Sequence, residues 1–338
     1  MFSFLSKKQS ILNIVIDDHV VRLLENRGSD VTAIKVLAER KLPGGLIENG
    51  KMVDEMQFYE VMKQLIQEFG LKMRPVRFYV PNALMIMRQV DVPRNVPEDE
   101  MVEHFFMEIG ETIHLPFEQP LLDVHVHPEA EEGEEAETRK ATLFAAPEEE
   151  VMKYTNVFED VSLKPVAIDV QALGVYRYYH YLHTLESSRT YLLFELNLTS
   201  TNISIFHQFH LEFLRYHPLD FHVSDWKGKV DEKNMITWEY VGDERAQINI
   251  IDDQVNELER LMNFYRYSLY KGEKMVDEIV IYGDHPDVEE VATKVKSMYD
   301  VSVTYLDGQL TSSKQDKIGS HFVPALGLAL KGGAFDAS

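Results

Sequence analysis

The sequence contains no cysteine, no long hydrophobic run and comparatively few basic residues. Without cysteine the chain can form neither disulfides nor thiolate metal sites, as is usual for proteins of a reducing compartment. No apolar run approaches the roughly 20 residues that a membrane-spanning helix needs. The 34 basic residues stand against 56 acidic ones, and a net charge of −22 repels nucleic acid and anionic lipid. We therefore expect a globular protein that binds no nucleic acid.

Glycine is also missing from the turns of a strand hairpin that occurs twice. In the first copy Ile11–Asp17 leads through a short turn into Val20–Glu25. In the second copy Tyr191–Glu195 leads through residues 196–201 into Asn202–Phe206. Each copy is an apolar strand that ends on an acidic residue, followed by a turn and a second apolar strand. A third predicted strand follows each hairpin, at residues 31–40 and 210–216.

Hydrophobic spacing and glycine or proline breaks predict the remaining elements. Further helices are predicted at residues 54–69, 97–109, 147–160, 171–184, 252–270, 286–299 and 322–330. Further strands are predicted at residues 76–80, 84–90, 121–127, 140–145, 166–170, 278–282 and 301–306. Residues 218–247 and 308–320 are predicted to be irregular and polar. The order indicates an α/β fold of two βββαβα units around a small α+β insert, divided at residues 1–83, 84–165 and 166–338.

Six segments, in this order and spacing, resemble the PilM family of type IV pilus assembly proteins, which is itself similar to the cell-division protein FtsA. They are the first hairpin (14–25), the loop 42–54, the start of the insert (90–93), the strand that leaves it (163–169), the second hairpin (199–205) and the closing helix (324–330). The resemblance covers nearly the whole chain. It implies an actin-like, ribonuclease H-like fold of two lobes, in which the duplicated hairpins form the two sides of a nucleotide cleft.

The resemblance also implies which positions would hold a nucleotide. In such a cleft an acidic residue at each strand end orients water around Mg²⁺. Glycine in each turn lets backbone N–H groups approach a phosphate, which a side chain would obstruct. The first turn keeps the acid, Asp17, but has His19 where the family has glycine.

The second hairpin turn and the turn after the predicted strand 278–282 depart from the family pattern as well. At the second hairpin Glu195 replaces aspartate and Asn197 replaces glycine, although Thr199 still offers a hydroxyl. The latter turn keeps one glycine, Gly283, where the family has several, and Asp284 adds a negative charge there. We therefore expect no catalytic residue, and weak or absent binding of ATP and Mg²⁺.

This expectation describes a pseudo-ATPase scaffold rather than an enzyme. Two roles remain open for Asp17 and Glu195: residual contacts to Mg²⁺, or polar residues that cap the turns or face solvent. No other metal site is predicted. His125 and His127 share one face of a predicted strand, but no third ligand occurs at a convincing spacing.

A partner is the last implication of the resemblance. Family members dock the short cytoplasmic N-terminal segment of PilN, a single-pass membrane protein, beside the insert near its junction with the first half. In this chain we expect Met85, Met87, Met101 and Phe105 to contribute to an adaptable peptide surface, although methionines can equally fill cores.

The expected function is a cytoplasmic adaptor at the inner face of the cell membrane. It would join a PilN-like partner to other inner-membrane and motor components of pilus, secretion or competence machinery, and it could form homo-oligomers. Two alternatives remain: a working ATP-binding switch of the same machinery, and a polymerising cytoskeletal protein like FtsA.

Overall fold

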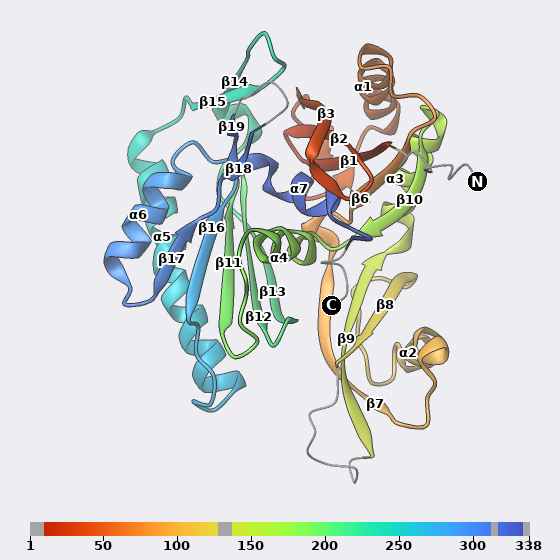
Figure 1. Ribbon diagram of the computed structural model, residues 1–338, viewed down its shortest axis with the longest axis vertical. Helices are drawn as coiled ribbons and strands as arrows, with labels where there is room; N and C mark the ends of the chain where they lie inside the picture. The colour runs from red at the N-terminus through yellow and green to blue at the C-terminus, as the bar shows by residue number, and fades with distance from the viewer. Residues whose placement is uncertain (1–9, 128–136, 312–316, 334–338) are drawn as a thin grey trace, which may run out of the picture.

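The computed structural model describes residues 10–127, 137–311 and 317–333, which form two lobes and a smaller insert beside the first lobe (Figure 1). The first lobe contains a five-stranded sheet in the order β10-β6-β1-β2-β3. Its strands are β1 (Ser10–Asp17), β2 (Val20–Arg27), β3 (Asp30–Lys41), β6 (Pro75–Tyr79) and β10 (Lys164–Asp169). β1 to β3 are antiparallel, whereas β6 and β10 run parallel to β1.

Alternation along β1 gives this sheet two buried faces. Leu12 and Ile14 pack with helices α1 (Glu55–Glu68) and α3 (Glu148–Asp160) on the outer side. Val15 points to the other side, into a core that the two lobes share.

The second lobe repeats this arrangement, with its sheet in the order β13-β12-β11-β16-β17. Its strands are β11 (Thr190–Leu196), β12 (Ser200–His207), β13 (His210–Pro218), β16 (Glu278–Tyr282) and β17 (Ser302–Tyr305). Each strand has a counterpart at the same place in the first sheet, so the repeat predicted from the paired hairpins is confirmed. The outer face is covered by α5 (Glu244–Asn263), its π-helical continuation Phe264–Leu269, and α6 (Val288–Met298).

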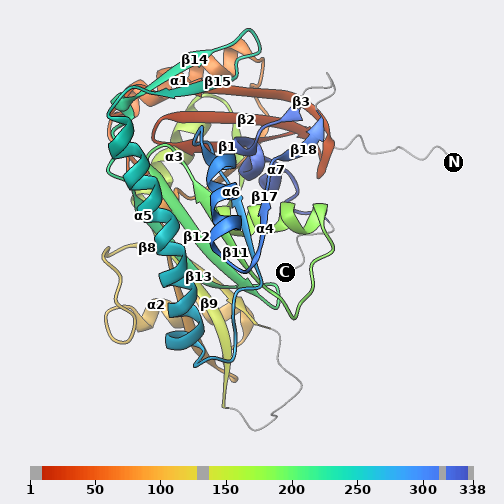
Figure 2. The same ribbon diagram turned by 90° about the vertical axis from the view of Figure 1, so that its left-hand side faces the viewer.

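Helices α4 (Gln171–Leu182) and α7 (Val323–Ala329) lie between the two sheets (Figures 1 and 2). They touch at two glycines: a Cβ on Gly327 would lie 2.1 Å from the carbonyl oxygen of Gly174. Tyr79 of β6 donates a hydrogen bond to the carbonyl oxygen of Pro324 at 2.9 Å. The helices α4 and α7 therefore connect the sheet of the first lobe to the sheet of the second.

The insert is a three-stranded sheet in the order β7-β9-β8 with one helix, α2 (Met101–Glu108). Its strands are β7 (Ile86–Pro93), β8 (Pro120–Val126) and β9 (Thr138–Pro147). The division expected between residues 165 and 166 falls inside β10, which pairs with β6 of the first lobe. We therefore propose that α3 and β10 are counted with the first lobe.

Two segments predicted to be irregular contain strands instead. Residues 218–247 hold the hairpin β14 (Trp226–Val230) and β15 (Ile236–Tyr240) as well as the start of α5. Trp226, Ile236 and Trp238 are buried although polar residues separate them, because alternate side chains of these strands face the lobe. Residues 308–320 hold the short strands β18 (Gly308–Thr311) and β19 (Lys317–Ile318).

The remaining elements are short. They are β4 (Ile47–Glu48), β5 (Lys51–Met52) and the 3₁₀ turns Asn82–Leu84, Glu98–Glu100, Val223–Asp225 and Ser320–Phe322. Within the described ranges, none of the helices combines the length and apolar character needed to cross a membrane.

Candidate functional site

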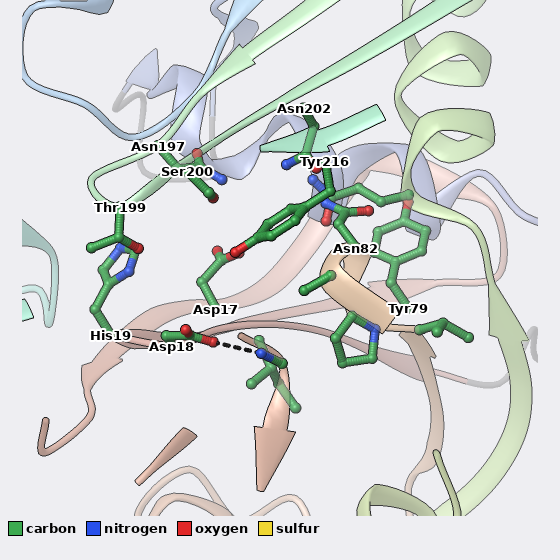
Figure 3. Close-up of a pocket in the computed structure, with 16 residues that line it drawn as sticks. Asp17, Asp18, His19, Tyr79, Asn82, Asn197, Thr199, Ser200, Asn202 and Tyr216 are labelled. Atoms are coloured by element: carbon green, nitrogen blue, oxygen red, sulfur yellow. Dashed lines mark hydrogen bonds between the residues drawn. The ribbon is translucent and has the colours of Figure 1, made fainter. Parts of the chain in front are cut away.

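The two hairpin turns face each other across a small polar pocket (Figure 3). The β1–β2 hairpin contributes Asp17, Asp18 and His19, and the β11–β12 turn contributes Asn197 and Thr199. The cavity has a volume of about 30 Å³. That is room for one or two water molecules, whereas pockets for small ligands span roughly 300–1,000 Å³. The fold thus brings Asp17, His19, Asn197 and Thr199 together around this pocket, which adjoins a larger groove of about 630 Å³ at Asp18, Thr199 and Tyr216.

Arg22, a buried residue of β2, holds three carboxylates at this place. Its Nε donates to Oε1 of Glu39 at 2.9 Å, its Nη1 to Oδ2 of Asp17 at 2.9 Å and its Nη2 to Oδ2 of Asp284 at 2.6 Å. Burial alone would lower the pKa of Arg22, but the three carboxylates outweigh it and raise that pKa. The guanidinium is therefore permanently charged, and Asp17 already has a cation as its partner.

Asp284 reaches this cluster from the second lobe, in the loop after β16. Its Oδ2 lies 2.7 Å from Nε2 of His19, and its Oδ1 accepts a hydrogen bond from the backbone N–H of Leu198 at 3.0 Å. Burial would raise the pKa of Asp284, but His19 and Arg22 outweigh it and hold that pKa well below its usual range. The negative charge expected to repel a phosphate is thus fully paired inside the protein.

Glu195, at the end of β11, is buried and bonded through both carboxyl oxygens. Its Oε1 accepts from Nε2 of Gln171 and its Oε2 from Nδ2 of Asn202, each at 2.6 Å. Burial, and then the charge of Asp17, raises the pKa of Glu195 to about 8. Of the roles left open for Glu195, facing solvent is excluded, because the residue is only 2% exposed.

This raised pKa gives stability a pH dependence. In the unfolded chain the carboxyl group ionises near its ordinary value, while in the folded protein it keeps its proton up to about pH 8. Folded-state stability is therefore lost as the pH rises toward that value. Between pH 6.5 and 9 we expect this carboxyl group alone to lower the free energy of unfolding by about 2 kcal/mol. Comparison with a variant that lacks it removes the contribution of the histidines, which titrate in the lower part of that range.

Urea unfolding of the wild type and of Glu195→Gln across that pH range checks this expectation. The glutamine cannot ionise, so the variant should show a flatter profile. An equal slope for both proteins would contradict the assignment.

Gly283 lets two loops of the second lobe pack closely together. Its φ is +141°, a backbone conformation reserved almost entirely for glycine, and a Cβ would lie 2.0 Å from the carbonyl oxygen of Leu196. Its N–H donates to Oγ of Ser320 at 3.1 Å. The glycine retained in this turn thus lets the β16 loop close against the second hairpin.

Taken together, these residues do not fit magnesium and a nucleotide in this arrangement. The first acid is bonded to an arginine, the second is bonded to two amides, and the pocket that Asp17 lines has room only for water. Sequence reasoning identified Asp17, His19 and Asp284 but missed Arg22 and Glu39. Their signal was present: both interrupt apolar strands, and they face each other across β2 and β3.

A second cavity, a mainly apolar groove of about 120 Å³, lies between the insert and the first lobe. It is lined by β8 residues Leu121 and Leu122, by Ile168 of β10, by Leu173 of α4 and by Met85. Of the four residues predicted to bind a partner, only Met85 lines this groove.

The other three residues predicted to bind a partner lie elsewhere. Met87 packs against the core shared by the lobes. Met101 and Phe105 are 2% and 3% exposed, because this face of α2 covers the insert sheet. The prediction that these two form a surface is wrong.

His125 of β8 and His127, just after that strand, meet a third histidine from the second lobe. His210 stacks on His127 with ring centroids 4.5 Å apart and lies 5.5 Å from His125. Burial, followed by the two neighbouring rings, lowers the pKa of His210 to about 4, and burial also lowers the pKa of His127. In the part of the chain that the structure describes, no three His, Asp or Glu side chains are arranged to hold a metal ion.

Comparison with solved structures agrees with this architecture. The PilM–PilN type IV pilus biogenesis complex matches with a TM-score of 0.74 at 20% identity, over 96% of this chain and 98% of that one. The ethanolamine utilization protein EutJ from Carboxydothermus hydrogenoformans matches with a TM-score of 0.51 at 9% identity, over 95% and 89%. A Bacteroides thetaiotaomicron protein with an actin-like ATPase fold matches with a TM-score of 0.49 at 10% identity, over 98% and 100%. The predicted actin-like fold is confirmed by the duplicated sheets and by the match to the PilM–PilN complex.

Sequence comparison gives the family. No curated protein matches the chain at the level of sequence. The family model for type IV pilus assembly protein PilM matches residues 14–220, which is more than half of the chain and includes both hairpins. The resemblance inferred from six short segments is thereby confirmed, and the chain belongs to the PilM family of type IV pilus assembly proteins.

Proposed function

We propose that this protein is a non-catalytic adaptor of type IV pilus or related secretion or competence machinery, which binds the N-terminal segment of a PilN-like membrane partner. Through that partner it would work at the cytoplasmic face of the membrane. The observation that carries the proposal is the apolar groove between the insert and the first lobe. Membership of the PilM family and the fold shared with a PilM–PilN complex support the choice of partner.

The groove has the features of a site for an extended peptide. Its walls include β8 and β10, which are the end strands of their sheets among the described residues, so each offers backbone groups to an added strand. Apolar side chains line most of it, and Lys331 lies at one side, 3.3 Å from Asp169. A short segment with alternating apolar residues suits such walls.

Peptide titration tests this role. The cytoplasmic N-terminal peptide of the PilN-like protein encoded beside this chain should bind, and Leu121→Arg should weaken binding at least about tenfold, because it places a charge in an apolar groove. Val102→Arg is the matched control, since Val102 and Leu121 are similarly exposed (40% and 39%) but Val102 lies on α2, outside the groove. Equal affinities for both variants would reject the groove.

We further propose that nucleotide binding is weak or absent. The paired state of Asp17, the bonded carboxyl of Glu195 and the small size of the pocket that Asp17 lines support this. Calorimetric titration with ATP and Mg²⁺ should show no saturable binding in the micromolar range. Micromolar binding that Asp17→Ala abolishes would favour the ATP-switch alternative, and pelleting that depends on nucleotide would favour an FtsA-like polymer.

A further inference from the structure

The charged cluster around Arg22 connects the two lobes directly. Arg22 and His19 belong to β2 and its turn in the first lobe, and both contact Asp284 of the second lobe, more than 260 positions along the chain. His19, Arg22 and Asp284 have side chains at most 2% exposed. These contacts therefore lie in a dry interior, where charge pairs are screened little by solvent.

Glu39 extends the same cluster to another part of the second lobe. Its Oε1 accepts from Arg22, while its Oε2 accepts from the backbone N–H of Ile236 at 2.8 Å. Its own N–H donates to the carbonyl oxygen of Asn234 at 2.9 Å. The hairpin β14–β15 is thus bound to β3, and Figure 2 shows the two side by side at one end of the molecule.

We propose that this cluster is a built-in latch, which holds the two lobes closed in place of a nucleotide. Arg22 supplies the positive charge that a divalent cation would bring to Asp17. Asp284 supplies the anionic oxygen that a phosphate would offer to the turn, because its Oδ1 accepts the backbone N–H of Leu198. The latch goes beyond the adaptor role, since it concerns how the lobes are held whichever partner binds.

The pattern of contacts distinguishes a latch from an ordinary ion pair. Each of the three guanidinium nitrogens donates to a different carboxylate. These belong to Asp17 on β1, Glu39 on β3 and Asp284 on the opposite lobe. Arg22 therefore has no N–H face left for a phosphate. The closed state is held by contacts of the chain itself, so it does not depend on a nucleotide.

The absence of cysteine makes the latch directly testable. Cysteines introduced at Met56 on α1 and Ile248 on α5, which are 71% and 58% exposed, accept spin labels on opposite lobes. Electron paramagnetic resonance should give one narrow distance distribution for the labelled protein, unchanged by ATP and Mg²⁺. In Asp284→Asn, which leaves Arg22 paired with Asp17 and Glu39, the distribution should broaden and shift to longer distances.

Glu25→Gln is the matched control. Glu25 is also buried and paired, but its partner Arg74 belongs to the same lobe, so the interlobe distance should not change. Should Asp284→Asn fail to fold, the neutral variant Arg22→Met/Glu39→Gln/Asp284→Asn leaves no unpaired charge from these three side chains and should show the same shift. A wild-type distribution in the folded latch variant, or a broad wild-type distribution that narrows with ATP, would overturn the proposal. The peptide titration tests the adaptor role and the interlobe distance tests the latch, so either proposal can fail without the other.

Discussion

Replacing Arg22 by methionine is expected to lower the free energy of unfolding by about 3–5 kcal/mol, the usual cost of leaving buried charges without their partner. Methionine fills a similar volume, so the change removes the guanidinium without creating a large cavity. Glu39 would keep one backbone hydrogen bond, and Asp284 would keep His19 and one backbone N–H. Urea unfolding at pH 7 measures the loss.

Two further variants separate the charge effect from packing. Arg22→Met/Glu39→Gln/Asp284→Asn should recover much of the lost stability, because it removes two of the three carboxylates together with their cation and leaves only Asp17, the most exposed of the three at 20%, without its partner. Arg40→Met breaks the pair with Glu68, in which both side chains are exposed (36% and 42%), so its loss should stay below about 1 kcal/mol. A loss for Arg22→Met no larger than that for Arg40→Met would show that the cluster contributes little.

The architecture could be predicted because its signals are local. Each hairpin is encoded by neighbouring residues, and the acid at the end of β1 or β11 marks where the strand stops. The hairpin β14–β15 was missed because its buried side chains, Trp226 and Trp238, are separated by lysines and acidic residues. Only the packing of the whole lobe decides that those two tryptophans are covered.

The site was predictable in its residue types but not in its contacts. His19 and Asn197, which stand where the family has glycine, both line the pocket between the turns. The pairing of Arg22 with Asp284 joins residues far apart in sequence, and no spacing rule connects them. Phe105 was misjudged for a related reason, since the exposed and buried faces of α2 become distinct only once the insert sheet is in place.

Gly283→Ala is the second change with a large expected effect, a loss of at least about 3 kcal/mol in the free energy of unfolding. The Cβ would lie 2.0 Å from the carbonyl oxygen of Leu196 and 2.7 Å from its carbon, so backbone must move. The φ of +141° adds conformational strain for any residue with a side chain.

Gly272→Ala separates the two causes. Gly272 also has a positive φ, +93°, but nothing lies within 4 Å of the position of its Cβ, so only backbone strain of about 1–2 kcal/mol is expected. Urea unfolding of both variants gives the difference, which reports the steric contact alone. Equal losses would mean that the β16 loop yields easily. A larger loss for Gly283→Ala shows that the chain itself requires this glycine, whether or not a nucleotide ever binds beside it.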